Sequence, residues 1–273
     1  MKIEVQNLGF GYKDERVLRD INLIIDKPGL ICIIGPNGVG KSTLVKCLLN
    51  LLKYTDGVIT IDGTDAKDLS AVDRARMMGY VPVGSEDTFS RTVLDLVLMG
   101  RHPHQQSGDT DKDLDWEIAM RSLNMMDVVD LAMKDSNELS AGQKQRVAIA
   151  KGLAQTPRVL VLDEPTANLD PRHQLRVTEK LKEISIEIGM TIIMISHDLN
   201  TAAKYADEII MMALPGVVYE VGTPEKVLTA ENIQKVYGVE CSVIDNHGRP
   251  HVILERPLGD EEYATLVKSE LTD

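Results

Sequence analysis

One nine-residue string restricts the folds that are open to this chain. Gly35–Thr43 reads GPNGVGKST and fits the pattern G-x-x-x-x-G-K-[ST]. It follows an apolar run, Leu30–Ile34, that is typical of a strand buried on both faces, and it opens Thr43–Leu52, which reads as a helix. Glycines let successive N–H groups point inward, and a helix N-terminus adds about half a positive charge. The order strand, glycine loop, helix therefore predicts a phosphate-binding site.

Two side chains of the string have predicted roles of their own. Lys41 can reach the β- and γ-phosphates of a nucleotide, and the Ser42 hydroxyl can ligate Mg²⁺. The alternative is a plain glycine turn, but a chance match would also have to fall between a strand and a helix. The nucleotide-binding residues predicted here are Gly35, Pro36, Asn37, Gly38, Val39, Gly40, Lys41, Ser42 and Thr43.

A second apolar run ends in two carboxylates. Val159–Leu162 reads as a buried strand and leads directly into Asp163 and Glu164. In open α/β folds ligands bind at the carboxyl ends of the strands, so both acids are expected there. Side chains alternate along a strand, and the two acids can therefore differ in role. We expect Asp163 to hold Mg²⁺ and Glu164 to polarise the attacking water; a solvated strand end is the alternative.

Strands and helices alternate along most of the chain, which indicates an α/β domain with a helical insertion between about residues 84 and 156. After Gly222 we expect a helical tail with one terminal hairpin near His247-Gly248. The other predicted strands are Lys2–Leu8, Asn22–Ile25, Val58–Ile61, Met78–Val81, Thr191–Ile195 and Glu208–Met212. The other predicted helices are Val93–Met99, Leu114–Leu123, Val147–Leu153 and Arg176–Ile188.

Composition excludes several classes of protein. The chain has 273 residues, with 30 Lys and Arg against 42 Asp and Glu, and this net charge of −12 argues against a nucleic-acid partner. No apolar run approaches the roughly 18 residues that cross a bilayer, and the sequence MKIEVQNL lacks the apolar segment of a signal peptide. Three widely spaced cysteines suggest neither disulfides nor a CxxC metal site. A cytosolic protein is expected.

Further motifs resemble those of the ATP-binding cassette (ABC) ATPases. Leu139–Ala154 reads LSAGQKQRVAIAKGLA and resembles their signature motif, usually LSGGQ, with Ala141 in the third place. Pro165–Asp170 is similar to the D-loop of the family, and His197 in the string ISHD to its switch histidine. Tyr12 resembles the aromatic residue that stacks on adenine. These motifs follow the family order, and the resemblance extends to about residue 255.

The resemblance implies a P-loop NTPase core, which is a RecA-like mixed sheet with an antiparallel β subdomain, plus an ABC-specific helical subdomain. The ATPase domain would span 1–222 and a C-terminal helical tail 223–273. ATP and Mg²⁺ would be the cofactors, with His197 and Lys41 joining Glu164 in catalysis. Two subunits would form a head-to-tail homodimer, each ATP lying between Gly35–Thr43 of one subunit and the signature of the other. The signature residues implied are Ser140, Ala141, Gly142 and Gln143.

One position departs from the family pattern. The family has Gln at the end of the strand before the helical insertion, whereas this chain has Val83. Valine offers neither a carbonyl to Mg²⁺ nor a hydrogen bond to the lytic water. Water can replace a single ligand of Mg²⁺, so binding of Mg²⁺-ATP is expected to persist while hydrolysis or coupling is weakened. Ser85, Glu86 or Asp87 are alternative donors.

Two segments resemble a subgroup of importer ATPases. Val97–His104 (VLMGRHPH) and Glu220–Val243 are similar to segments in importers for iron–siderophore complexes, haem and cobalamin. The resemblance implies a peripheral protein on the cytoplasmic face of the membrane, which works with integral permease subunits and an extracytoplasmic substrate-binding protein. The alternatives are a soluble cassette ATPase of iron–sulfur cluster assembly and a nucleotide-binding regulator with weak hydrolysis.

Overall fold

The computed structural model describes the whole chain except residues 14, 85–89, 108–110, 168, 260–261 and 264–273. Its central layer is a sheet of six strands, which are β3 (Gly29–Ile34), β6 (Met78–Val81), β7 (Val159–Leu162), β8 (Thr191–Ile195), β9 (Glu208–Ala213) and β10 (Val217–Gly222). They lie in the order β10-β9-β3-β8-β7-β6, and only the β10–β9 pair is antiparallel. Every residue of β3, β7 and β8 is buried, because a parallel sheet is covered on both faces.

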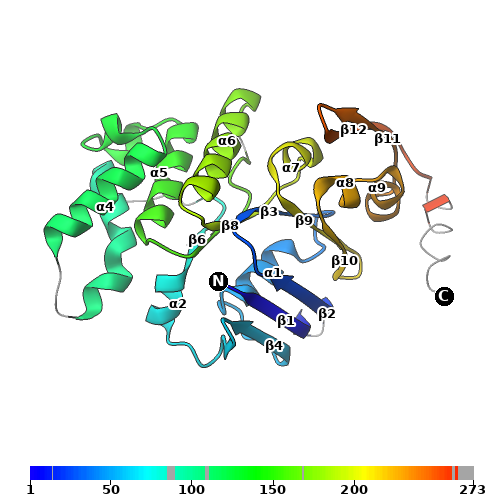
Figure 1. Cartoon of the computed structure of the whole chain (residues 1–273), viewed down its shortest axis with the longest axis horizontal. Coiled ribbons are helices and arrows are strands. Elements are labelled where there is room, and N and C mark those ends of the chain that lie inside the picture. The colour runs from blue at the N-terminus through cyan, green and yellow to red at the C-terminus, as the bar shows by residue number, and fades with distance from the viewer. Residues whose placement is uncertain (14, 85–89, 108–110, 168, 260–261, 264–273) are drawn as a thin grey trace.

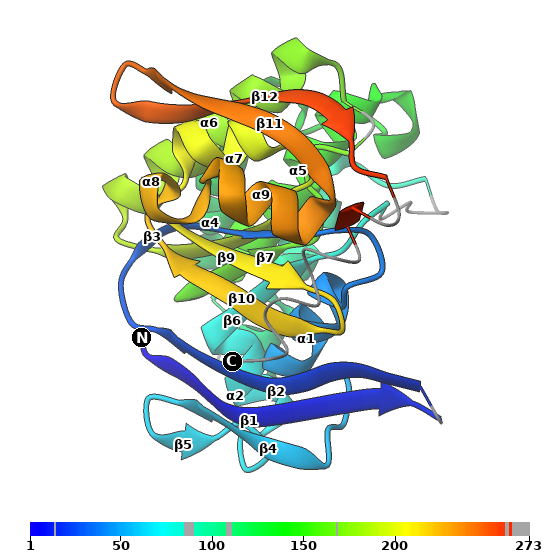
Figure 2. The ribbon, with the colours of Figure 1, turned by 90° about the vertical axis from the view of Figure 1, so that its right-hand side faces the viewer.

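A second, antiparallel sheet has the order β2-β1-β4-β5. Its strands are β1 (Ile3–Tyr12), β2 (Glu15–Ile25), β4 (Asp56–Ile61) and β5 (Thr64–Asp65). Helix α1 (Lys41–Leu48) lies between this sheet and the central one (Figure 2). Leu44 and Leu48 of the helix share one apolar core with Ile3 of β1 and Ile31 of β3. This core fixes the helix that begins at the phosphate loop.

Helices gather at one end of the molecule (Figure 1). We call residues 93–154 the helical region; it contains α3 (Val93–Leu98), η1 (Met99–Ser107), α4 (Lys112–Met125), η2 (Val129–Leu131), η3 (Ser136–Glu138) and α5 (Ala141–Ala154). A buried ion pair joins three of these elements: Arg101 Nε donates to Asp115 Oδ1 at 2.8 Å, and Arg101 Nη1 donates to the Ala154 carbonyl at 2.7 Å. The ends of η1, α4 and α5 are thereby held together.

Three more helices flank the central sheet, namely α2 (Ala71–Met77), α6 (Pro171–Glu187) and α7 (Leu199–Tyr205). Helix α6 buries Val177, Leu181 and Ile184 of the apolar face that the helical spacing of the sequence predicts. Ile188, the last residue at that spacing, is the C-cap of the helix and is exposed. In the part of the chain that is described, no helix is both long and apolar enough to cross a membrane.

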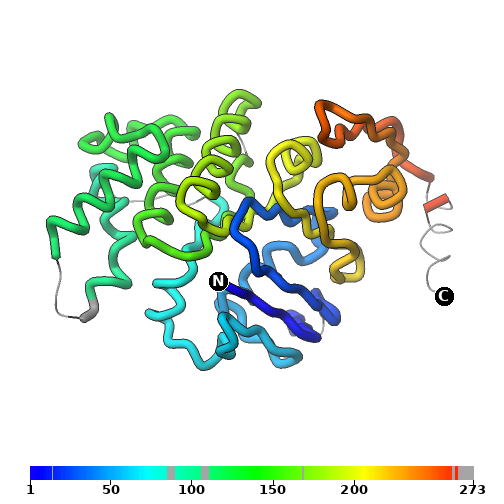
Figure 3. The backbone as a smooth tube through the Cα atoms, viewed as in Figure 1, coloured from blue at the N-terminus to red at the C-terminus, as the bar shows by residue number. Residues whose placement is uncertain are grey.

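The tail, residues 223–263, lies at the end opposite the helical region (Figure 3). It consists of α8 (Pro224–Val227), α9 (Ala230–Tyr237) and a hairpin of β11 (Val239–Asn246) and β12 (Arg249–Pro257). His247 and Gly248 both have positive φ, 57° and 81°, as a two-residue type I′ turn requires. The predicted hairpin is confirmed, but the tail is less helical than the sequence predicts, because the hairpin is longer than its two helices together. The boundary at residue 222 stays a prediction.

Helix boundaries differ from those predicted. Thr43–Leu52 is expected to be helical, but α1 ends at Leu48, and Asn50 just beyond it has a φ of +49°. Asparagine tolerates this left-handed geometry, which is incompatible with a continuing helix. In the opposite direction, α5 begins at Ala141 and not at Val147, because Ser140 and Gln143 form a capping box at its start.

Candidate nucleotide-binding site

The phosphate loop connects β3 to α1 through glycines in unusual backbone conformations. Gly35 and Gly40 have φ values of +148° and +102°. A Cβ on Gly35 would lie 2.4 Å from the Met212 carbonyl oxygen, and one on Gly40 would lie 2.8 Å from the side chain of Leu18. The lack of space for a Cβ and the positive φ therefore both require glycine at these two positions. Since Gly40 is the N-cap of α1, no capping side chain occupies the first N–H groups of this helix.

Lys41 lies against this loop. Its Nζ donates hydrogen bonds to the carbonyls of Gly35 and Pro36, each at 2.8 Å, and the residue is 6% exposed. Burial lowers the pKa of Lys41, while the charges of Glu164 and Asp163 act in the opposite direction. A cation is thus held beside N–H groups that favour an anion.

Asp163 connects the loop to the end of β7. Ser42 Oγ donates to Asp163 Oδ1 at 2.9 Å, and Tyr80 OH donates to Asp163 Oδ2 at 3.3 Å. The Asp163 N–H also donates to the Val81 carbonyl at 2.9 Å, so the carboxylate has a fixed place. Burial raises the pKa of Tyr80 to about 12, with a further contribution from Asp163. A hydroxyl and a carboxylate side by side are hard oxygen donors of the kind Mg²⁺ prefers, so this pair fits the ion.

Glu164 and His197 form a pair at the same edge of the sheet. His197 Nε2 lies 2.6 Å from Glu164 Oε1, and both side chains are partly exposed. Glu164 follows β7 and His197 follows β8, the neighbouring strand. Glu164 has a φ of +49°, which is a strained conformation for a non-glycine residue. The structure thus brings together Lys41, Ser42, Asp163, Glu164 and His197.

The signature residues lie elsewhere. Ser140 is the N-cap of α5 and accepts the Gln143 N–H at 3.4 Å, while Ser140 N donates to Gln143 Oε1 at 2.9 Å. Ala141 and Gly142 form the first turn; a Cβ on Gly142 would lie 3.2 Å from the His173 ring. Among the described residues, no hydrogen bond or ion pair joins Ser140–Gln143 to Gly35–Thr43. In the described part of one chain, the signature thus has no such contact with its own phosphate loop.

Tyr12 lies at the end of β1 and is 48% exposed. Its ring packs edge-to-face on Phe10, with the centroids 4.9 Å apart. An exposed aromatic ring with a supporting neighbour is suited to stack on a base, and the adenine contact stays a prediction.

Known proteins share this sequence and fold. The ABC transporter family model matches residues 18–167, which is more than half of the chain. An ABC transporter ATP-binding protein of Methanocaldococcus jannaschii is 40% identical over 259 residues, covering 95% of this chain and 99% of its own. The chain belongs to the ABC transporter family. It is an ATPase of that family with the P-loop fold.

Other relatives of this ABC ATPase are named as import proteins. The iron(3+)-hydroxamate import ATP-binding protein of Bacillus subtilis is 35% identical over 242 residues, which cover 89% of this chain and 90% of that protein. A solved structure described as a metal-chelate type ABC transporter in an inward-facing conformation matches with a TM-score of 0.80 at 27% identity. The match covers 93% of this chain and 96% of the other.

Three sequence predictions for this ABC ATPase concern residues that lie outside the described part of the chain or beside it. Val83 follows β6 and is 49% exposed, but the alternative donors Ser85, Glu86 and Asp87 lie outside the described residues. Residue 168 of the D-loop segment Pro165–Asp170 lies outside them as well. At Asp170 the segment ends as the N-cap of α6, where the carboxylate accepts the His173 N–H at 3.0 Å.

Tyr80 contacts the site but is not among the residues that the sequence predicts. Tyr80 lies on β6, and the register of β6 with β7 pairs it with Val161, two residues before Asp163. Nothing in the local sequence around Tyr80 indicates this neighbour. Only the order of the strands in the central sheet brings the hydroxyl to the carboxylate.

Proposed function

We propose that this ABC ATPase is the ATP-hydrolysing subunit of an importer for metal chelates of the iron–siderophore, haem or cobalamin type. The observation that carries the ATPase chemistry is the convergence of Lys41, Ser42, Asp163, Glu164 and His197 at the carboxyl ends of β3, β7 and β8. The named import proteins among the relatives support the cargo class. They give no support to iron–sulfur cluster assembly or to a regulator with weak hydrolysis.

Each residue of the site has one task in this proposal. The N–H groups of Gly35–Thr43 and the ammonium of Lys41 bind the phosphates. Ser42 and Asp163 would hold Mg²⁺, which neutralises phosphate charge when it is bound. Glu164 orients the attacking water and accepts its proton, and His197 orients Glu164 through the 2.6 Å contact.

The second half of the site is proposed to come from a second copy of the chain. The first turn of α5 offers the N–H groups of Ala141 and Gly142 and the Ser140 hydroxyl to a γ-phosphate. This half lies apart from the phosphate loop of its own chain, so a head-to-tail homodimer completes two sites. ATP would close the dimer and hydrolysis would reopen it.

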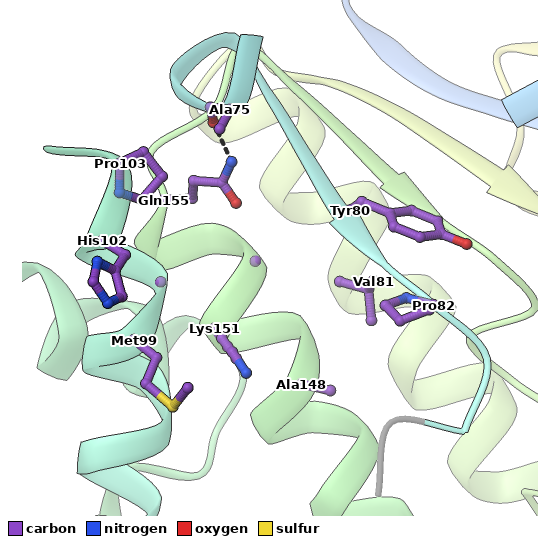
Figure 4. Close-up of a pocket in the computed structure, with 12 residues that line it drawn as sticks. Ala75, Tyr80, Val81, Pro82, Met99, His102, Pro103, Ala148, Lys151 and Gln155 are labelled. Atoms are coloured by element: carbon purple, nitrogen blue, oxygen red, sulfur yellow. Dashed lines mark hydrogen bonds between the residues drawn. The ribbon is translucent and has the colours of Figure 1, made fainter. Parts of the chain in front are cut away.

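A groove beside β6 is suited to dock the permease. It measures about 340 Å³, and Pro82, Met99, His102 and Lys151 are among the residues that line it. In Figure 4, Met99, His102 and Lys151 from η1 and α5 border the space below Gln155. Gln155 donates to the carbonyls of Ala75 and Met78, which ties α5 to α2 and β6. We infer that an amphipathic helix of the permease lies here, which would place the chain at the cytoplasmic face of the membrane.

Substitution of Glu164 tests the chemistry. Glu164→Gln removes the proton acceptor and should lower ATP turnover by about 10³-fold, while ATP still binds and holds two chains together. Turnover assays and gel filtration with ATP measure both effects. A Glu164→Gln protein that turns over at the wild-type rate, or stays monomeric with ATP, contradicts the proposal.

Copurification tests the partner. A tagged chain, expressed in its native cells, should copurify with a permease that has many membrane spans. Met99→Glu should abolish this copurification, because it places a carboxylate in the groove. Met133→Glu is the matched control, since Met133 is 77% exposed and does not line the groove. Equal recovery with both variants would exclude the groove, and recovery of no membrane protein with the wild type would exclude the importer.

A further inference from the structure

The C-terminal hairpin packs on the helix that follows the switch histidine. Helix α7 begins at Leu199, immediately after His197 and its N-cap Asp198. In Figure 2 the hairpin of β11 and β12 extends across the top of the molecule, above α7 and α9. The tail is thus the structural neighbour of one catalytic loop, although it lies beyond the residues that the family model matches.

One side chain joins the two elements by a pair of hydrogen bonds. Asn200 Nδ2 donates to the Val252 carbonyl at 3.0 Å, and the Val252 N–H donates to Asn200 Oδ1 at 2.8 Å. Val252 is 4% exposed, so this two-bond contact is shielded from water. Asn200 can satisfy both Val252 backbone groups at once because an amide carries a donor and an acceptor side by side.

The loop that carries His197 is therefore fixed on both sides. On the sheet side, the Ser196 N–H donates to the Ile33 carbonyl of β3 at 3.1 Å. On the helix side, Asp198 Oδ1 accepts the Asn200 N–H at 2.9 Å, and Asn200 is in turn bound to Val252. His197 is the residue between these two attachments.

A cavity of about 270 Å³ lies between the same elements. His197, Leu199 and Asn200 form one wall, and Tyr237, Val252 and Leu254 of the tail form another. The hairpin and the imidazole thus border one space. Movement of the hairpin would change the surroundings of His197 directly.

We propose that the C-terminal hairpin positions the switch histidine, with Asn200 as the positioning residue that transmits the constraint. The proposal rests on the proposed role of His197 in hydrolysis. It assigns to the contact of Asn200 with Val252 a task in turnover and none in nucleotide binding, because these two residues reach the loop after β8. The tail residue beside the phosphate-loop backbone at Gly35 is a different one, Tyr237 of α9.

The test replaces Asn200 of α7 and, for comparison, an asparagine of the tail. Asn200→Ala should lower the ATPase kcat of the full-length protein about tenfold while KM for ATP changes by less than about twofold. The imidazole resonance of His197, identified by its loss in His197→Gln, should shift in this variant. Asn232→Ala is the control: Asn232 Nδ2 donates to the Val227 carbonyl at 3.0 Å within the tail, and the described residues show no hydrogen bond from Asn232 to α7. It should leave both readouts unchanged.

A second variant serves if Asn200→Ala does not fold. Asn200→Asp keeps the acceptor for the Val252 N–H and loses the donor, so its kcat should fall between those of the wild type and the alanine variant. The proposal is overturned if the Asn200 variants keep wild-type kcat and His197 resonance, or if Asn200→Ala and Asn232→Ala reduce kcat and Tm equally. If His197→Gln itself retains full activity, the proposed role of His197 fails, and the resonance still reports whether the hairpin positions the ring.

Discussion

The two helix N-termini assigned to nucleotide binding are built in opposite ways. Helix α1 starts after a glycine, and Lys41, Ser42 and Asp163 surround its first turn within one chain. Helix α5 starts with a capping box in which Ser140 and Gln143 satisfy each other. The first terminus is in contact with three side chains of the proposed site. Among the described residues, no hydrogen bond or ion pair links the second terminus to a side chain proposed for catalysis. The difference is the one that the proposed head-to-tail dimer predicts, in which a second copy of the chain completes each site.

A mixture of two inactive variants tests most directly whether two copies of the chain complete one site. Lys41→Ala removes the cation from one terminus and Gly142→Asp places a carboxylate at the other, so each variant alone should keep less than about 1% of wild-type turnover. Mixed dimers contain one site with both halves intact. An equal mixture should therefore recover up to about a quarter of wild-type ATPase activity, measured as phosphate release.

Each variant mixed with itself at the same total concentration is the control for that experiment. No recovery in the equal mixture, with both variants folded and dimeric, would mean that one chain completes its own site.

The position of α5 depends on a buried ion pair, so Asp115→Asn should have the next largest effect. It leaves Arg101 unpaired and should lower the free energy of unfolding by about 3 kcal/mol, measured by urea denaturation at pH 7. Burial alone would raise the pKa of Asp115, but hydrogen bonds from Arg101 and Gln105 outweigh it and lower that pKa. The ion pair therefore stabilises the fold above the unfolded-state pKa, and this is lost as pH falls through the folded-state pKa.

The wild-type advantage over Asp115→Asn should consequently shrink below about pH 4. Asp127→Asn is the control, because Asp127 pairs with Arg176 on the surface and should contribute less than about 0.5 kcal/mol. A stability difference between wild type and Asp115→Asn that is independent of pH would contradict the assignment.

Tyr80→Phe tests whether the Tyr80 hydroxyl positions Asp163 beside the N-terminus of α1. It removes the hydroxyl that donates to Asp163 Oδ2, a contact worth about 1 kcal/mol. The Mg²⁺ concentration for half-maximal ATPase activity should rise about fivefold, while nucleotide binding without Mg²⁺ stays unchanged. Tyr205→Phe is the control, since the ring of Tyr205 lies under the ammonium of Lys204 and the described residues show no hydrogen bond from Tyr205 to Asp163. An unaltered Mg²⁺ requirement would show that Tyr80 does not position Asp163.

Val83→Gln should have the smallest effect. It restores the residue type that the family has at this position and should raise turnover about twofold through a contact to the lytic water. Steady-state ATPase assays at saturating Mg²⁺-ATP measure it. An equal or lower rate would mean that Val83 does not limit hydrolysis.

Local patterns predict the order of strand, glycine loop and helix around Gly35–Thr43, because the glycines, the lysine and the serine stand within one string. The strand that ends in Asp163 was equally evident, since its apolar run is short and unbroken. The contact of Tyr80 with Asp163 and that of Asn200 with Val252 could not be predicted. Both depend on which elements become neighbours in space, and no local propensity encodes that order.

Strand β6 has two faces with different surroundings. The Tyr80 ring projects to the other side of β6 from Met99, His102 and Lys151, as Figure 4 shows, and its hydroxyl reaches Asp163. The backbone of the same strand holds the Asp163 N–H through the Val81 carbonyl. A mechanical signal from an occupant of the groove would therefore need to cross only one strand, β6, to displace the carboxylate that faces Ser42.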